Sequence, residues 1–216
     1  MTPQSLYDIL YKHYGNLNWW PAKSPYEMIV GAILVQNTNW SNVQKAIANF
    51  GDNLRPEFVL SADLETIRDI IRPAGFFNAK SGYLVSVTGW FMQYDFDVQK
   101  ALKKPLHKLR GELLAVRGIG METADCILLY AMGLPTFVID AYTVRLCERL
   151  GLAAQLNLSA NTKKNYMILK EYFEVHMPKN VQVYNNYHAL IVEHGKTYCH
   201  KKPLCGECPL CEWCLV

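Results

Sequence analysis

The 216-residue chain lacks any apolar run of the roughly 18–20 residues that a membrane-spanning helix needs. Its first residues, MTPQSLYDILYKHYG, also lack the charged-then-apolar order of a secretory signal peptide. These two absences predict a cytoplasmic protein with no membrane partner, or a nuclear one if the source is eukaryotic. Low-complexity stretches and internal repeats are absent as well. Half of the residues are hydrophobic, which is enough for one large domain or two small ones.

A strong excess of charge of one sign is also missing. Lys and Arg number 22 against 19 Asp and Glu, which leaves a net charge of only +3. Such a weakly basic chain is compatible with nucleic-acid binding but does not argue for it alone, so the distribution of charge matters more. Positive side chains gather near the C-terminus, at Lys196, His200, Lys201 and Lys202. This cluster predicts either a contact with nucleic-acid phosphates or an ordinary solvated patch.

Strand-like alternation of apolar and polar residues is scarce, and apolar residues recur at helical spacing along most of the chain. A capping box at Ser24–Glu27, with Pro25 at the first helical position, predicts one helix start. The sequence therefore predicts an all-α protein. Its expected helical segments are 24–33, 40–50, 61–71, 80–94, 106–116, 122–132, 141–150, 166–175 and 184–194.

The cysteines are not spread through the chain, as they would be in a disulfide scaffold. Five of the seven cysteines crowd into the final 18 residues, with the spacing Cys199-x5-Cys205-x2-Cys208-x5-Cys214 and Cys211 inside the last interval. This clustering predicts a metal site. Four thiolates so close suit an iron–sulfur cluster or zinc, and the spacing leans only weakly between the two.

What the chain does have is a glycine-rich turn between two apolar segments. Gly118 and Gly120 permit positive φ and leave no Cβ in the way, so the stretch predicts helix, tight turn, helix. Free N–H groups at the start of the second helix would suit a phosphate and hold a nucleic-acid backbone without reading its sequence. A plain connection between two packed helices fits equally well. An apolar run then delivers one carboxylate, Asp140, at a helix start, where Asp is also a good N-cap.

These residues resemble a known family. The stretch LLAVRGIGMETADCILLYAMGLPTFVIDAYTVRLCERLG is similar to the helix–hairpin–helix, Gly/Pro-rich loop and aspartate signature of the endonuclease III-like DNA glycosylase superfamily, and the cysteines resemble its 4Fe–4S loop. The resemblance runs from about Trp19 to Cys214, with the three motifs in the family's order. Four further stretches resemble the small bacterial 3-methyladenine DNA glycosylases of the endonuclease III-like type: NWWP (18–21), VQNTNW (35–40), RPAGFFNAK (72–80) and GIGMETAD (118–125).

The resemblance implies two helical domains with damaged double-stranded DNA bound in a cleft between them. A six-helix domain carrying the hairpin would span residues 22–133, and an iron–sulfur domain would join 1–21 to 134–216. The protein would be a base-excision repair enzyme of the cytoplasm, associated with the bacterial nucleoid while it acts on DNA. We expect a monomer, since a site for one lesion needs no symmetry.

The resemblance also implies catalytic roles. Asp140 would stabilise positive charge on the sugar and orient or deprotonate the attacking water. Glu122 matches the position where bifunctional relatives carry a lysine that forms a Schiff base with the sugar. Glutamate cannot form that bond, so we expect base removal that leaves the strand whole. Glu122 would line the base pocket, orient water or simply face solvent.

Further roles follow for nucleotide flipping and binding. Gln36 would enter the space left in the duplex, and Phe76 would wedge into the opposite strand, unless Phe76 is an ordinary core residue. An indole face favours a cationic methylated base by about 0.5–2 kcal/mol. At least one of the three pocket tryptophans is expected to be structural. The pocket residues expected are Trp19, Trp20, Pro21 and Trp40, and the other DNA contacts are Gly118, Gly120, Thr123, Lys201 and Lys202.

The cysteine loop departs from the family pattern, which has six residues rather than five between its first two cysteines. We expect a structural 4Fe–4S cluster, with zinc as the alternative and Cys211 as a spare thiol; the expected ligands are Cys199, Cys205, Cys208 and Cys214. Two other functions stay open. One is a glycosylase for a mismatched, deaminated or oxidised base, and the other is a non-catalytic DNA-binding iron–sulfur protein, against which the carboxylate of Asp140 argues.

Overall fold

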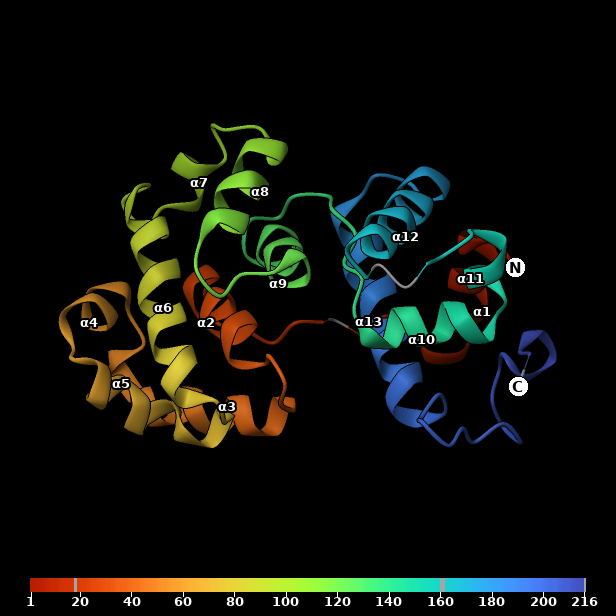
Figure 1. Cartoon of the computed structure of the whole chain (residues 1–216), viewed down its shortest axis with the longest axis horizontal. Coiled ribbons are helices and arrows are strands. Elements are labelled where there is room, and N and C mark those ends of the chain that lie inside the picture. The colour runs from red at the N-terminus through yellow and green to blue at the C-terminus, as the bar shows by residue number, and fades with distance from the viewer. Residues whose placement is uncertain (18, 160–161, 216) are drawn as a thin grey trace. The chain divides into compact units, whose positions relative to one another are not determined.

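A computed structural model describes residues 1–17, 19–159 and 162–215, so Asn18 of the NWWP stretch lies outside the described residues (Figure 1). Every regular element in these ranges is a helix, which confirms the predicted all-α class. The chain divides into two compact units. We name Trp20–Leu134 the central unit, and Met1–Trp19 together with Pro135–Val216 the terminal unit.

The central unit is built around one buried helix, α2 (Pro25–Leu34), which packs against α3, α6, α9 and η3. Ser24 accepts a hydrogen bond from the backbone N of Glu27 (3.1 Å) and starts α2, with Pro25 at its first turn. The other elements of this unit are α3 (Trp40–Phe50), η1 (Gly51–Asn53), α4 (Pro56–Ser61), α5 (Leu64–Ile71), η2 (Arg72–Ala74), α6 (Phe77–Met92), α7 (Val98–Ala101), α8 (Leu106–Ala115), α9 (Met121–Cys126) and the π-helical turn η3 (Ile127–Ala131).

The terminal unit packs around its longest helix, α13 (Val181–Thr197), which contacts α1 (Pro3–Tyr14) and α10 (Ala141–Arg149). An aromatic core holds it together. The rings of Phe137 and Phe173 stack with centroids 4.5 Å apart, and the edges of Tyr184 and Tyr187 meet Phe137. The remaining elements are α11 (Leu152–Gln155), α12 (Thr162–His176) and η4 (Cys211–Trp213).

The helices differ from the predicted segments in three respects. The segment 61–71 is not one helix: α4 ends at Ser61, and α5 starts at Leu64 because the side chain of Asp63 accepts from Thr66 N (2.8 Å). The segment 122–132 changes from α-helix to a π turn after Cys126. The short helices α4, α7 and α11 give too few turns to produce a periodic pattern. Within the described ranges, no helix is both long and apolar enough to cross a bilayer.

Candidate active site

The glycine-rich turn joins α8 to α9 in the central unit, and Gly118 is the residue that makes it. Gly118 has φ +86°, in the left-handed region that favours glycine. A Cβ at this position would lie 2.2 Å from Cγ of Tyr83, so the ring of Tyr83 covers the space beside the glycine. Backbone conformation and packing both require glycine here.

Gly120 has a different environment and does not adopt the positive φ that glycine permits. It is extended, with φ −89° and ψ 179°, and it is the N-cap residue of α9. No heavy atom lies within 4 Å of the place where its Cβ would stand. The space beside Gly120 is therefore open at the start of α9, and the fold itself does not demand a glycine there.

The structure brings Gln36 and Thr123 together at this hairpin. The side-chain amide of Gln36 donates to the carbonyl of Gly118 (3.1 Å) and to Oγ1 of Thr123 (3.0 Å). Gln36 follows the C-terminal end of α2, and the next residue, Asn37, has φ +54°. The loop after α2 is thus attached to the hairpin through one side chain. For Gln36 to reach into a duplex, it must first exchange both of these bonds.

Phe76 belongs to the central unit, where it is the N-cap residue of α6. Its side chain is 66% exposed, so Phe76 does not pack in the core. The residue has φ +49°, which is unusual for a bulky side chain, and it follows Gly75 at φ +67°. A strained backbone here presents an apolar ring to solvent.

The tryptophans expected in one pocket divide between the two units. Trp20 and Trp40 belong to the central unit and meet edge to face, with ring centroids 4.9 Å apart. Tyr130 adds a third ring 5.3 Å from Trp20. Trp19 belongs to the terminal unit, where Nζ of Lys196 stands 5.0 Å above its ring. Pro21 is exposed.

Gly31 makes room for this aromatic group. A Cβ there would approach the Trp40 ring to 3.3 Å. Tyr130 was not predicted from the sequence, because a tyrosine inside an apolar helical segment gives no signal of its own.

Asp140 is the N-cap of α10 in the terminal unit, as the sequence predicted. Its Oδ1 accepts from the backbone N (2.7 Å) and Oγ1 (2.8 Å) of Thr143, and its Oδ2 lies 3.4 Å from Nε2 of His188 on α13. Burial, the largest influence, raises the pKa of this carboxyl, but the bonds and charge of His188 and the bonds from Thr143 outweigh it. The pKa of Asp140 is therefore below its usual value, and the carboxyl is ionised at neutral pH although it is only 8% exposed.

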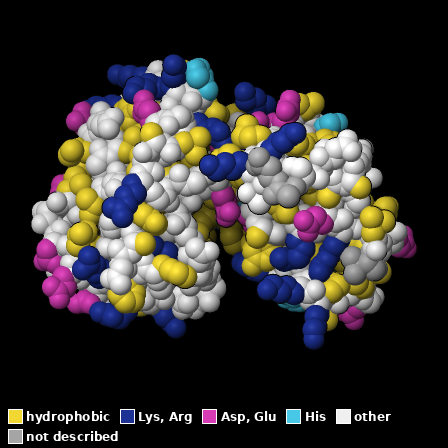
Figure 2. All heavy atoms as spheres, in the orientation of Figure 1, with side chains coloured by type: hydrophobic (Ala, Val, Ile, Leu, Met, Phe, Trp, Pro, Cys, Tyr) yellow, Lys and Arg dark blue, Asp and Glu magenta, His cyan; other side chains and the backbone are white. Residues whose placement is uncertain are grey.

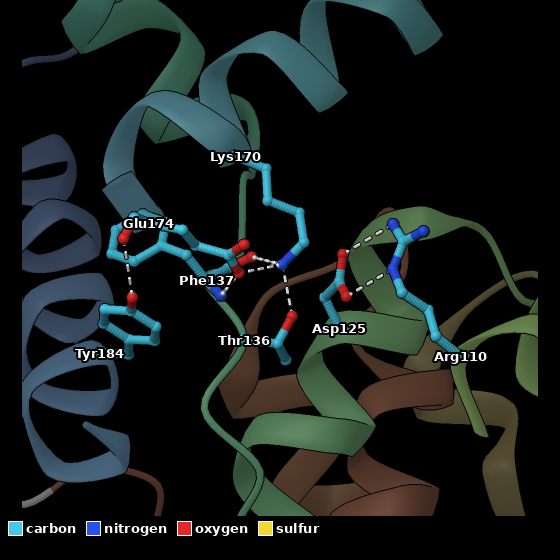
Figure 3. Close-up of polar contacts among 7 residues, drawn as sticks. All are labelled: Arg110, Asp125, Thr136, Phe137, Lys170, Glu174 and Tyr184. Carbon is cyan, nitrogen blue, oxygen red and sulfur yellow. Dashed lines mark hydrogen bonds and ion pairs between the residues drawn. The ribbon is translucent and has the colours of Figure 1, made fainter. Parts of the chain in front are cut away.

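The loop that leads to Asp140 is held by α12 (Figure 3). Oε1 of Glu174 accepts from the backbone N of Phe137 (2.8 Å), while Nζ of Lys170 donates to the Phe137 carbonyl (3.1 Å), to Glu174 (2.5 Å) and to Oγ1 of Thr136. Both polar backbone groups of Phe137 are thus fixed by one ion pair. Lys170, Glu174 and His188 were not predicted from the sequence as residues of the site. The i,i+4 spacing of Lys170 and Glu174 was the one available signal.

Glu122 lies in the first turn of α9, where its side chain is exposed. One turn further in, the carboxylate of Asp125 is fully buried and accepts a bidentate pair of bonds from Arg110 on α8, at 2.8 and 3.0 Å (Figure 3). This ion pair ties together the two helices of the hairpin. The first turn of α9, with Glu122, is therefore presented from a rigid base.

The cysteine loop follows α13 and is fastened to α10 by Arg149. Nη1 of Arg149 donates to Sγ of Cys199 (3.0 Å), and its Nη2 donates to the carbonyls of His200 (2.6 Å) and Lys201 (3.2 Å). Lys201 and Lys202 are exposed. Figure 2 shows Lys and Arg side chains gathered over α10 and the end of α13. Over residues 1–17, 19–159 and 162–215, no three His, Cys, Asp or Glu side chains are arranged as a finished metal site.

Comparison with known proteins shows which family this arrangement represents. The profile of the HhH-GPD superfamily of base excision DNA repair proteins matches residues 30–171, a range that includes the hairpin and Asp140. The chain belongs to the HhH-GPD superfamily. A protein of Methanocaldococcus jannaschii, provisionally named a DNA repair glycosylase, is 46% identical over 214 residues, which cover 97% of this chain and 94% of the relative. Endonuclease III of Sulfolobus acidocaldarius is 30% identical over 180 residues, covering 82% and 75%.

Solved structures share the HhH-GPD fold. A non-covalent complex of endonuclease III with DNA aligns over 100% of this chain and 96% of its own, with a TM-score of 0.81 at 20% identity. The 3-methyladenine DNA glycosylase of Helicobacter pylori, bound to 1,N6-ethenoadenine, aligns over 91% of this chain and 98% of its own, with a TM-score of 0.73 at 23% identity. The HhH-GPD protein described here is a base-excision repair DNA glycosylase of the endonuclease III type.

Proposed function

We propose that this HhH-GPD protein is a monofunctional glycosylase that hydrolyses the N-glycosidic bond of alkylated purines of the 3-methyladenine type. The observation that carries the proposal is Glu122 in the first turn of α9, at the position where strand-cleaving relatives carry a lysine. A carboxylate cannot form the Schiff base on which strand cleavage depends. The protein therefore releases the base and leaves an intact strand with an abasic site.

Asp140 is the catalytic carboxylate of the proposed reaction. As the glycosidic bond breaks, positive charge develops on the sugar, and a fixed carboxylate stabilises it. Because Oδ1 of Asp140 already accepts two bonds from Thr143, Oδ2 is the oxygen that would turn toward the sugar and the attacking water, and its 3.4 Å contact with Nε2 of His188 would have to lengthen or be shared. Because the pKa of Asp140 is lowered, no proton has to leave before the reaction starts. The clamp of Lys170 and Glu174 on Phe137 fixes the loop that carries it.

An alkylated purine suits this single-carboxylate chemistry. A base methylated at a ring nitrogen is already cationic, so it leaves without a strong general acid. The ring pair of Trp20 and Trp40 supports this choice, because an indole face attracts a cation by about 0.5–2 kcal/mol. The fold shared with a 3-methyladenine DNA glycosylase that binds an ethenoadenine agrees with a purine substrate.

Double-stranded DNA with a damaged base is the proposed partner. The open backbone at Gly120 admits a phosphate close to the start of α9. Lys201 and Lys202 would hold a second stretch of the phosphate backbone. Gln36 and the exposed ring of Phe76 would fill the stack after the damaged base has left it.

We further propose that Cys199, Cys205, Cys208 and Cys214 hold a 4Fe–4S cluster. The donor set fits this group, because four soft thiols lie within one short segment at the end of the chain. A bound cluster would stabilise the loop and thereby position Lys201 and Lys202. Absorption near 400 nm and iron content, at about four irons for each chain, test this assignment without any activity assay.

The test of the function uses a duplex that carries one 3-methyladenine. Released base is measured by chromatography, and the DNA is run on a denaturing gel without alkali or heat. Base release with an uncut strand is the expected result. A cut strand refutes the monofunctional assignment. No release from a folded protein refutes the alkylpurine assignment, and a panel of mismatched, deaminated and oxidised bases then identifies the substrate.

Asp140→Asn separates catalysis from binding. Asparagine also caps helices, so α10 should keep its start and the fold its stability. We expect base release to fall by at least about a hundredfold, in line with the loss of a charge-stabilising group, while the affinity for lesion-containing DNA remains. Glu148→Gln is the matched control, because it removes an exposed carboxylate from the same helix and should retain base release. Equal activity in Asp140→Asn and the wild type would show that another group is catalytic.

A further inference from the structure

Lys80, on α6, has an almost completely buried ammonium group. Its side chain is 1% exposed, and Nζ donates to the carbonyls of Leu34 and Ala74, both at 2.8 Å. A buried charge is costly unless it is hydrogen-bonded. An ammonium group has three donors and no acceptor, so two donors serve two carbonyls that are 40 positions apart in the sequence.

The positions of the two carbonyls link Lys80 to the DNA-facing loops. Leu34 is the last residue of α2 and stands two positions before Gln36, and Ala74 is the last residue of η2 and stands two positions before Phe76. Carbonyls at helix ends lack a partner within the helix. One side chain supplies the missing partner at both ends, two positions before each residue that we propose to enter the duplex.

Both segments adopt a backbone that needs support. Asn37 and Phe76 are non-glycine residues with φ +54° and +49°, a conformation that persists only where the surroundings hold it. Lys80 contributes further contacts to the second segment: its backbone N donates to the Phe76 carbonyl (3.0 Å), and Nζ lies 6.0 Å from the centre of the Phe76 ring. Lys80 thus contacts the Phe76 segment through main chain and side chain alike.

We propose that Lys80 is a positioning residue that couples the Gln36 and Phe76 segments, so that they engage the duplex as one unit. The proposal rests on the DNA-penetrating roles proposed above for these two residues. A single ammonium cannot keep both short bonds when only one segment moves, so displacement of one segment favours displacement of the other. Burial lowers the pKa of Lys80 to about 8, so the group carries its charge at neutral pH.

A double-mutant cycle measures this coupling. The affinity for a fluorescein-labelled duplex with one tetrahydrofuran abasic analogue is measured by anisotropy for Gln36→Ala, Phe76→Ala and the double variant. The cycle is then repeated in the background of Lys80→Met, which keeps the aliphatic stem and removes the donors. In the wild-type background, we expect the double variant to lose at least about threefold less affinity than the product of the single losses. In Lys80→Met, the single losses should multiply to within about twofold.

Two further variants support the interpretation of this experiment: one controls for the loss of charge, and the other replaces Lys80→Met if that variant does not fold. Lys100→Met removes an exposed lysine of the same unit, whose ammonium pairs with Asp95 (2.7 Å), and it should leave the coupling unchanged. It therefore accounts for the loss of one positive charge near DNA. If Lys80→Met does not fold, Lys80→Gln replaces it, because the shorter amide cannot span both carbonyls.

The outcomes separate this inference from the proposed function. Coupling in the wild type that disappears with Lys80 supports the inference. The inference is overturned if the affinity losses of the two single variants multiply in the wild-type background, or if the coupling survives in Lys80→Met. Base release from alkylated DNA would stand in either case. Single variants that bind as tightly as the wild type overturn both the inference and the roles of Gln36 and Phe76.

Discussion

Gly118→Ala is the substitution whose cost the structure defines best. Alanine at φ +86° would have to adopt a left-handed backbone, which costs about 1–2 kcal/mol. Its Cβ would also lie 2.2 Å from Cγ of Tyr83, so the ring has to move, at a further cost of about 1–3 kcal/mol. The sum is about 2–5 kcal/mol, which corresponds to a fall of about 4–20 °C in Tm for a chain of this length.

Gly120→Ala is the matched control. Gly120 is extended, and nothing lies within 4 Å of its missing Cβ, so the fold should tolerate alanine to within about 0.5 kcal/mol. If a DNA phosphate approaches Gly120, this variant should still bind DNA more weakly than the wild type. The pair therefore separates a glycine needed for folding from a glycine needed for binding.

Calorimetry and chemical denaturation of both variants, in the wild-type and Tyr83→Ala backgrounds, complete the test. Without the ring, Gly118→Ala should cost only the backbone part, about 1–2 kcal/mol. Equal stability of Gly118→Ala and Gly120→Ala would refute the argument from φ and packing together. An unchanged cost in Tyr83→Ala would refute the packing part alone.

Three other substitutions test the ionisable groups. In His188→Leu, the pKa of Asp140 should rise, because burial raises it and His188 is a main opposing influence. The acid limb of kcat/KM should then move to higher pH, and so should the loss of stability that occurs as pH falls through the folded pKa of Asp140. An acid limb that stays in place would exclude this role of His188. Burial lowers the pKa of Lys80 to about 8, against about 10.4 in an unfolded chain. Between these two pH values the unfolded state binds more protons than the folded state. The contribution of Lys80 to the unfolding free energy should therefore rise with pH across this window. Across that range, the unfolding free energy of the wild type should rise relative to that of Lys80→Met, by about 3 kcal/mol at most, because the other titrating groups are common to both proteins. Lys170→Met removes the partner of the partly exposed Glu174 and leaves the Phe137 carbonyl without this donor, so it should cost about 1–3 kcal/mol by the same assay; a change within about 0.5 kcal/mol would contradict the clamp.

The sequence predicted those parts of the fold that depend on local pattern. Periodic apolar residues gave the all-α class, and Asp140 at the end of an apolar run gave the N-cap of α10. The π turn after Cys126 has no local signature, because the residues Ile127–Ala131 are as apolar as an α-helical core. The start of α5 at Leu64 depends on one side-chain bond of Asp63, which competes with an equally plausible start at Ser61.

The candidate site was less accessible from sequence, because its residues meet through tertiary structure. Gln36 reaches Gly118 across 82 positions, and Lys80 reaches Leu34 across 46. Spacing along the chain cannot indicate such pairs. The two glycines show the same limit at short range, since identical residues two positions apart differ in φ and in free space. A pattern identifies which residue types occur at a turn, and the neighbours decide what each of them does.

The ring of Tyr83 over Gly118 has a spectroscopic consequence. One of the two α-protons of Gly118 occupies the direction in which a Cβ would point, toward the ring atoms Cγ, Cδ1 and Cδ2 of Tyr83. The ring current should shift this proton strongly upfield and separate it from its geminal partner. That resonance would report on the state of the hairpin in solution without a label, and its movement during a titration with duplex would show when DNA reaches the turn.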